Sequence, residues 1–166
     1  MNLIKVLLGV AIIIFFGFCG YLLARKYRKR KLFFEQFQIF NERFLGEVTY
    51  CRRPILEFLT KFTYKGEFAL LLADYMRAIG GERINLGEFL QYSDYDFLKT
   101  EDKAFLNDYL SMLGRSDSTS QKSYISSAGH EIEARKNDAQ SEYKKRGDLY
   151  LKLGLLLGLF ILILLI

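Results

Sequence analysis

The chain begins with an apolar run that is long enough to cross a membrane. From Val6 to Ala24 no residue carries a charge, and as a helix these 19 residues cover about 28 Å, close to the thickness of a hydrocarbon core. The alternative is a cleaved signal peptide, but that would have a shorter apolar run ending in small residues. The pattern therefore predicts a transmembrane helix over 6–24.

A second apolar run lies at the other end of the sequence. The 14 residues from Leu153 to Ile166 are uncharged, and a helix counted from Leu149 reaches about 27 Å if Lys152 extends its ammonium to the headgroups. The alternative is a short apolar helix buried in a soluble core, but an aliphatic tail without a polar cap argues against it. We therefore expect a second transmembrane helix over 149–166.

Both apolar runs have basic residues on the side that adjoins the central segment. By the positive-inside rule, the central segment is then cytoplasmic, and residues 1–5 and the carboxyl end face outward. The stretch 25–31 could also be a nucleic-acid patch or a site for anionic lipid, but its position next to a membrane helix favours a topology signal. These bases are Arg25, Lys26, Arg28, Lys29, Arg30 and Lys31 after the first run, and Lys144, Lys145 and Arg146 before the second.

Residues 32–148 carry apolar side chains at helical spacing. A stripe of positions three or four apart predicts an amphipathic helix whose face packs in a core, with a binding groove as the alternative. Shorter helices are expected after Pro54, over 66–79 and over 86–92. The sum is an all-α protein, a cytoplasmic helical bundle between two transmembrane helices. The stripe consists of Phe33, Phe37, Phe40, Phe44 and Val48.

Two more helices are predicted in the second half of the central segment. The first has Thr100 as its N-cap and Gly114 as its C-cap, and its expected inward residues are Ala104, Phe105, Tyr109, Met112 and Leu113. The second follows an N-cap at Ser116 or Asp117 and runs from about 118 to 146, with Gly129 and Gly147 as weak points. Its charged half is expected to project as a stalk beyond the inward residues Ile125, Ala128 and Ile132.

The composition limits the chemistry that the chain can perform. One histidine and two cysteines cannot build a Cys/His metal cage or a multi-bridge disulfide framework. No Gly-Lys dipeptide occurs, so a P-loop is absent. His130 is interpreted as a solvated helical side chain, and acid pairs such as Glu101 and Asp102 as charge at exposed helix starts. We therefore expect no catalytic residue, cofactor or metal.

Two further patterns are candidates for binding. Between residues 82 and 108 seven acids face three bases, which indicates either an acidic dock for a basic partner or, by preference, a solvated surface. Gly154 and Gly158 form a GxxxG pattern with Gly147 a heptad earlier, which would let another helix approach closely. The seven acids are Glu82, Glu88, Asp94, Asp96, Glu101, Asp102 and Asp108.

The net charge of +5 does not indicate nucleic-acid binding. Residues 1–31 carry seven bases and no acids, whereas residues 32–148 carry 16 bases and 19 acids. The basic character therefore belongs to the predicted membrane boundary, and the central segment is mildly acidic.

The motifs of the second half resemble those of a known family. A Leu-Gly-x-x-Asp turn at Gly114 and Asp117 is followed by Gln121-Lys122 and then by a Tyr-x-x-Leu-Gly pattern from Tyr150 to Gly154. In this order the chain is similar to the stage III sporulation protein AB family over nearly its whole length.

The resemblance implies a membrane component of the channel between mother cell and forespore in endospore-forming bacteria. Its cytoplasmic domain would then look like that of the type II secretion inner-membrane platform protein and would couple a hexameric ATPase to the channel without catalysis. Other channel membrane proteins and a second copy of the chain are further expected partners, in the mother-cell membrane around the forespore. The alternative hypothesis is a membrane-tethered regulatory adaptor that binds a cytoplasmic partner through its bundle.

Overall fold

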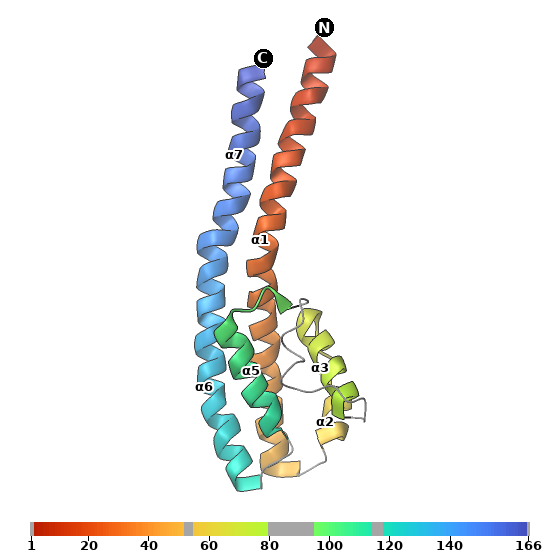
Figure 1. Cartoon of the computed structure of the whole chain (residues 1–166), viewed down its shortest axis with the longest axis vertical. Coiled ribbons are helices and arrows are strands. Elements are labelled where there is room, and N and C mark those ends of the chain that lie inside the picture. The colour runs from red at the N-terminus through yellow and green to blue at the C-terminus, as the bar shows by residue number, and fades with distance from the viewer. Residues whose placement is uncertain (1, 52–54, 80–94, 114–117, 166) are drawn as a thin grey trace. The chain divides into compact units, whose positions relative to one another are not determined.

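The computed structural model describes residues 2–51, 55–79, 95–113 and 118–165, and the elements in these ranges are helices (Figure 1). This confirms the predicted all-α class. The helix expected over 86–92, the position of Pro54 and the caps expected at Gly114, Ser116 and Asp117 lie outside the described residues. In chain order the elements are α1 (Asn2–Gly46), a π-helical turn (Glu47–Cys51), α2 (Ile55–Lys61), α3 (Gly66–Ile79), α5 (Thr100–Met112), α6 (Ser118–Glu142), a second π-helical turn (Tyr143–Gly147) and α7 (Asp148–Leu165).

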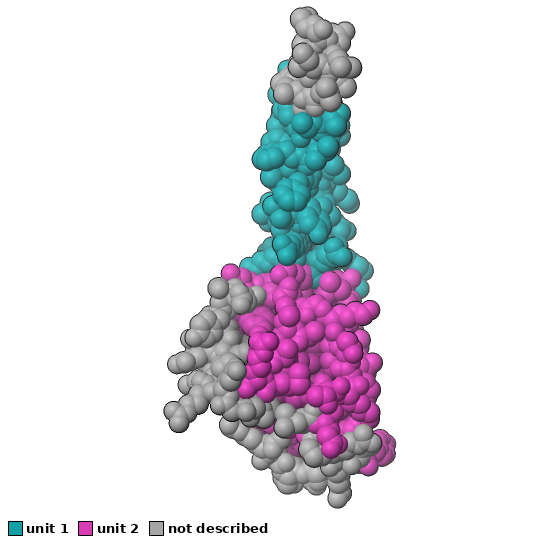
Figure 2. All heavy atoms as spheres, turned by 90° about the vertical axis from the view of Figure 1, so that its right-hand side faces the viewer, with its two compact units in different colours: residues 1–28, 139–166 teal, residues 29–138 magenta. Residues whose placement is uncertain are grey.

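The chain divides into two compact units, which Figure 2 shows in different colours. Unit 1 consists of residues 1–28 and 139–166, and unit 2 of residues 29–138. Both α1 and α6 contribute residues to each unit. The domain boundaries proposed from the sequence, which follow the membrane surface, stay predictions.

The core of unit 2 forms around the phenylalanine stripe of α1. Phe33, Phe37, Phe40 and Phe44 are all buried, which confirms that the stripe packs in a core, while Val48 is half-buried. Phe34, three residues before Phe37 and absent from the predicted stripe, is buried as well. The buried face is therefore wider than the predicted stripe.

Ring contacts from α1 hold three other helices of unit 2. Phe37 meets Tyr109 of α5 edge to face at 4.9 Å between ring centroids and stacks on Phe68 of α3 at 5.4 Å. Phe40 meets Phe58 of α2 at 5.5 Å. Offset and edge-to-face pairs of this kind add to the free energy gained by burying the rings.

Two buried tyrosine hydroxyls of this core form hydrogen bonds between helices. Tyr109 donates a hydrogen bond to Asn41 Oδ1 at 2.9 Å, and Tyr75 donates to the backbone carbonyl of Leu110 at 3.0 Å. A buried hydroxyl without a partner would cost the free energy of its lost hydration. The two bonds therefore fix α1 and α3 against α5.

The inward face of α5 agrees with the expected one only in part. Leu106, Tyr109, Leu110 and Leu113 are buried, as the 3–4 spacing of one helix face requires. Ala104 is exposed, and Phe105 and Met112 are half-buried. The prediction is thus confirmed for Tyr109 and Leu113 and wrong for Ala104, and it missed Leu106 and Leu110.

The inward residues predicted for α6, Ile125, Ala128 and Ile132, are buried. The expected departure of the charged half as a stalk is wrong for the residues up to Asp138, because the side chains of Arg135 and Asp138 bond to residues of α1 and α5 within unit 2. Gly129 does not interrupt α6, whereas Gly147 lies in the π-helical turn.

Candidate functional site

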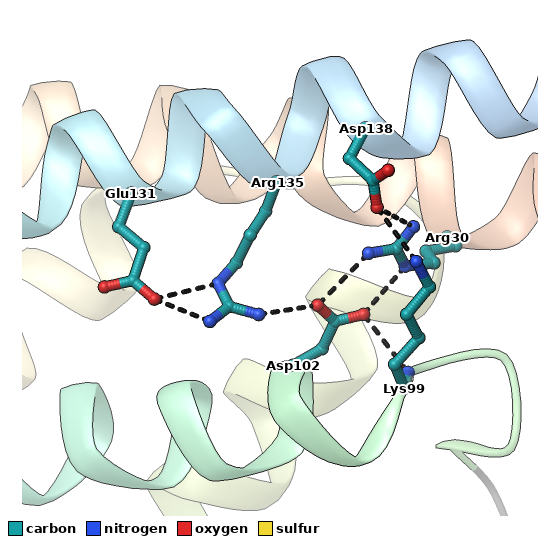
Figure 3. A network of polar contacts seen from close by, with 6 residues as sticks. All are labelled: Arg30, Lys99, Asp102, Glu131, Arg135 and Asp138. Carbon is teal, nitrogen blue, oxygen red and sulfur yellow. Dashed lines mark hydrogen bonds and ion pairs between the residues drawn. The ribbon is translucent and has the colours of Figure 1, made fainter.

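Unit 2 contains a network of charged side chains centred on Asp102, which is only 1% exposed (Figure 3). Arg30 of α1 donates to this carboxylate from Nε at 2.7 Å, and Arg135 of α6 donates from Nη1 at 2.8 Å. The backbone N–H of Lys99 donates to it at 3.1 Å. One carboxylate therefore joins α1, α5 and α6.

Asp138 and Glu131 extend the network toward solvent. Asp138 accepts hydrogen bonds from Arg30 Nη1 and Lys99 Nζ, both at 3.0 Å, and its side chain is 50% exposed. Glu131 accepts two bonds from Arg135, one turn further along α6. Three cations thus face three carboxylates, so the network is neutral.

The network favours the ionised form of Asp102 and Asp138. Burial by itself would raise the pKa of Asp102, but hydrogen bonds and charge from Arg30, with those from Lys99 and Arg135, lower it below its ordinary value. The pKa of Asp138 is lowered mainly by its hydrogen bond from Lys99. Burial would lower the pKa of Arg135, but its bonds to Glu131 and Asp102 raise it.

This geometry corrects three sequence-based expectations. Asp102 does not lie on an exposed turn, so it cannot belong to an acidic surface dock. Arg30 is only 4% exposed and forms an ion pair with Asp102 inside unit 2, so it is not only the topology signal that the sequence indicated. The N-cap of α5 is Lys99 rather than Thr100, and Asp102 at the third helical position accepts the N–H of this cap residue.

Of the other six predicted acids, the structure describes three. Asp96, Glu101 and Asp108 are exposed. Glu82, Glu88 and Asp94 lie outside the described residues. The structure therefore leaves three described members for the dock suggested by the sequence.

In unit 1 the glycines of α7 lie against the first part of α1. A Cβ added at Gly154 would lie 2.6 Å from the carbonyl oxygen of Phe16, and one added at Gly158 would lie 3.0 Å from the Cα of Ile13. A Cβ on Gly20 would lie 2.6 Å from the carbonyl oxygen of Tyr150. Glycine is needed here because the two backbones approach too closely for a side chain.

Gly147 does not share this role. Its added Cβ would lie 2.8 Å from the ring of Tyr143, which belongs to the same π-helical turn. Of the family-like positions that the structure describes, Tyr150 stacks on Tyr27 at 6.1 Å, Gln121 is half-buried and Lys122 is exposed. Gly114 and Asp117 lie outside the described residues.

The basic residues next to the apolar runs fall into two groups. Lys29 pairs with Glu67, Lys31 pairs with Glu35, and Arg30 is part of the network. The others are exposed and belong to unit 1. These are Arg25, Lys26, Arg28, Lys144, Lys145 and Arg146.

The helices of unit 1 have the length and composition of membrane helices. Two helical stretches, Gly9–Tyr50 and Ser120–Leu164, contain apolar windows of mean hydropathy 1.6 and 2.0, and only 17% of each window is buried. Large side chains such as Phe15, Phe18, Leu156 and Phe160 are exposed. An exposed apolar surface of this kind is typical of a face that meets lipid or another apolar helix.

The described residues offer little for catalysis. Within the described ranges no three His, Cys, Asp or Glu side chains are placed to hold a metal ion. His130 is exposed on α6. The carboxylates of the network are already neutralised by arginine and lysine, so the arrangement can hold three helices together by charge-assisted hydrogen bonds.

Fold and site together define a helical protein with two candidate membrane helices and a separate helical unit stabilised by aromatic and ionic contacts. A family model described as stage III sporulation protein AB matches residues 5–166, and the chain belongs to that family. The family implies a role in sporulation. No curated protein and no solved structure matches the chain significantly.

Proposed function

We propose that this protein is a non-enzymatic membrane scaffold of the channel between mother cell and forespore. In this role it would couple a cytoplasmic hexameric ATPase to the membrane complex during endospore formation. The observation that carries the proposal is that α1 and α6, two helices of unit 2, lead along the chain into the two apolar stretches. A helical unit attached to a membrane at both ends suits a part that holds a soluble partner at the bilayer.

The interior of unit 2 supports a binding role over a catalytic one. The most buried of its described acids, Asp102, has two arginines and a backbone N–H as partners, which keep it ionised, so it has no proton to donate near neutral pH and is a weaker base than a free carboxylate. A function of unit 2 would then depend on its surface.

For the ATPase contact we propose the exposed acids of α5. Glu101 and Asp108 are both exposed on this helix, and opposite charge on a partner would speed association and fix its orientation. Charge reversal of these two residues tests the contact without altering the core.

The experiment compares Glu101→Lys/Asp108→Lys with a matched reversal elsewhere in unit 2, Glu42→Lys/Glu57→Lys, also at exposed positions. In an endospore-forming host, the α5 variant should lower both the yield of heat-resistant spores and the recovery of the ATPase with the membrane protein. The control should lower neither. Normal sporulation after complete removal of the gene would refute the scaffold role as a whole.

The alternative function, a membrane-tethered regulatory adaptor, is less well supported. It would use the GxxxG face of the second span for a partner, but Gly154 and Gly158 lie against α1 of the same chain. Substituting alanine for the exposed residues Leu156 and Phe160 of α7, with both glycines kept, distinguishes the adaptor from the scaffold. An adaptor that senses another membrane helix should lose its function, whereas the scaffold should keep it.

A further inference from the structure

We propose that six exposed bases of unit 1 form a binding surface for anionic phospholipid headgroups. This basic cluster consists of Arg25, Lys26, Arg28, Lys144, Lys145 and Arg146. The proposal rests on the membrane location that the proposed function assumes, and it goes beyond that function because it assigns a lipid class to a surface.

The antiparallel packing of unit 1 brings the two basic runs to the same level. Successive contacts pair Gly9 with Leu162, Ile13 with Gly158 and Gly20 with Tyr150. Residue numbers therefore increase along α1 as those of the partners on α7 decrease. Continuing this register by a turn and a half places residues 25–28 level with residues 143–147.

A direct contact confirms the register at this level. A hydrogen bond with the Tyr27 hydroxyl raises the pKa of Arg146, and Tyr27 also stacks on Tyr150 with an interplanar angle of 19°. Arg146 thus lies beside the α1 run. Two stretches that are far apart in sequence therefore form one basic surface.

The bases of the cluster are available to a ligand. Arg25, Lys26, Arg28, Lys144 and Lys145 make no ion pair with any described residue. Their neighbours Lys29, Arg30 and Lys31 are instead paired with acids of unit 2. The sequence run 25–31 therefore changes its role after Arg28, from an exposed surface to structural contacts.

The excess charge of the protein is concentrated in unit 1. This unit carries eight Lys and Arg against two Asp and Glu, whereas unit 2 carries sixteen against seventeen. The two acids of unit 1, Glu142 and Asp148, lie next to the cluster in sequence and cannot neutralise six bases. An anion is therefore attracted to unit 1 and not to unit 2 as a whole.

The surroundings of the cluster favour a phospholipid as the source of that anion. Exposed apolar side chains, among them Leu22, Leu23 and Leu149, adjoin the cluster in the chain, so a phosphate and acyl chains could be bound together. The stacked Tyr27 and Tyr150 are the aromatic type found where hydrocarbon meets headgroups. A free phosphate or a nucleic acid would not use the apolar part.

The test places the full-length protein in nanodiscs that contain phosphatidylcholine and phosphatidylglycerol. The lipids that stay with the protein on release are counted by native mass spectrometry. Wild type should retain phosphatidylglycerol in preference. Lys144→Gln/Lys145→Gln should reduce this preference, by about fivefold for each charge removed, and added salt should reduce it in wild type.

The control variant is Lys65→Gln/Lys122→Gln, which removes two exposed lysines of unit 2 and should keep the wild-type preference. Arg25→Gln/Lys26→Gln provides a second cluster variant, should the first misfold. Equal retention of the two lipids by wild type, or an unchanged preference in both cluster variants, would overturn the proposal.

Three further results would also overturn it, each for a separate reason. Release of phosphatidylglycerol by inorganic phosphate would indicate a site for the free anion. Binding of duplex DNA to discs of pure phosphatidylcholine that carry the protein would indicate a nucleic-acid surface. Failure of the chain to stay with the discs would remove the membrane location itself, and with it that part of the proposed function.

Discussion

At the scale of single residues, Asp102 is the position whose environment matters most. Its side chain is 1% exposed and receives hydrogen bonds from two arginines, so its charge is compensated by protein groups instead of water. Removing one partner of a buried ion pair leaves the other charges without compensation. Asp138 belongs to the same network, but half of its side chain is exposed.

The substitution Asp102→Asn should therefore lower the free energy of unfolding by about 3 kcal/mol, because the buried Arg30 and the half-buried Arg135 would each lose one of their two anionic partners. Asp138→Asn, the matched control, should cost about 1 kcal/mol or less, since water replaces its contacts. Chemical denaturation of the full chain in detergent micelles measures both. Equal losses for the two variants would show that burial of Asp102 is not what stabilises unit 2.

The same residue predicts a dependence of stability on acid. The pKa of Asp102 is lower in the folded protein than its ordinary value of 3.8, and so is that of Asp138. Such groups stabilise the folded state above the unfolded pKa, and this stabilisation is lost as pH falls toward the folded pKa. The midpoint temperature of thermal unfolding should thus decrease as the pH falls below about 4.

Thermal unfolding followed by circular dichroism from neutral pH down to acid tests this dependence. In Asp102→Asn the midpoint temperature should decrease less with acid than in wild type. Wild-type Asp102 takes up a proton when the protein unfolds in acid, and the variant has no carboxylate at this position to do so. A variant that loses stability with acid as steeply as wild type would contradict the assignment.

The burial of Asp102 could not be predicted from the sequence. Its partner Arg30 is 72 residues away, and Arg135 is 33 residues away, so no local pattern connects them. Locally, the pair Glu101-Asp102 has the composition of any charged helix start. The position of Arg30 in a run of bases suggested a membrane signal, which hid its role inside unit 2.

At the scale of elements, helices with a strong period were predictable and irregular turns were not. The stripe from Phe33 to Phe44 and the inward residues of α6 follow the helical repeat, so their burial could be inferred without knowing what they contact. The π-helical turns Glu47–Cys51 and Tyr143–Gly147 have no such signal, because neither five-residue segment contains a pattern that distinguishes it from a regular helix.

The helix pair of unit 1 provides a prediction at this scale. Gly154→Ala should weaken the packing of α1 on α7, because its Cβ would come 2.6 Å from the carbonyl oxygen of Phe16. We expect a lower midpoint of thermal unfolding in micelles, as follows when extra volume is forced into a tight contact.

Leu157→Ala is the matched control for this variant. Leu157 is 50% exposed on the same helix, so its truncation should leave the midpoint nearly unchanged. A Gly154→Ala protein as stable as wild type would show that the two backbones do not approach as closely as described.

At the scale of the whole molecule, the two apolar stretches and the charges beside them predict how the chain lies in a membrane. The sequence predicts two spans with both termini outside and the central segment in the cytoplasm. Bases at the same level on α1 and before α7 are consistent with a hairpin whose basic end faces one side.

Labelling of single cysteines with a membrane-impermeant maleimide tests this topology, after replacement of Cys19 and Cys51 by serine. In intact cells Asn2→Cys should react from outside, and Lys122→Cys should react only after the membrane is permeabilised. An epitope placed after the carboxyl terminus should be accessible from outside. Reaction of Lys122→Cys in intact cells would show that the orientation is reversed.

The π-helical turn Tyr143–Gly147 also has a consequence for how the length of this chain can vary. In a π-helical turn the backbone hydrogen bonds join residues five apart, so this turn contains one residue more than the corresponding turn of a regular α-helix. The wide turn absorbs the additional residue. A single-residue deletion inside it would restore a regular helix and keep both glycines of α7 facing α1. The same deletion between Gly147 and Gly154 would rotate Gly154 and Gly158 away by about 100°. Natural variation in length by one residue should therefore be tolerated at the turn and excluded just beyond it.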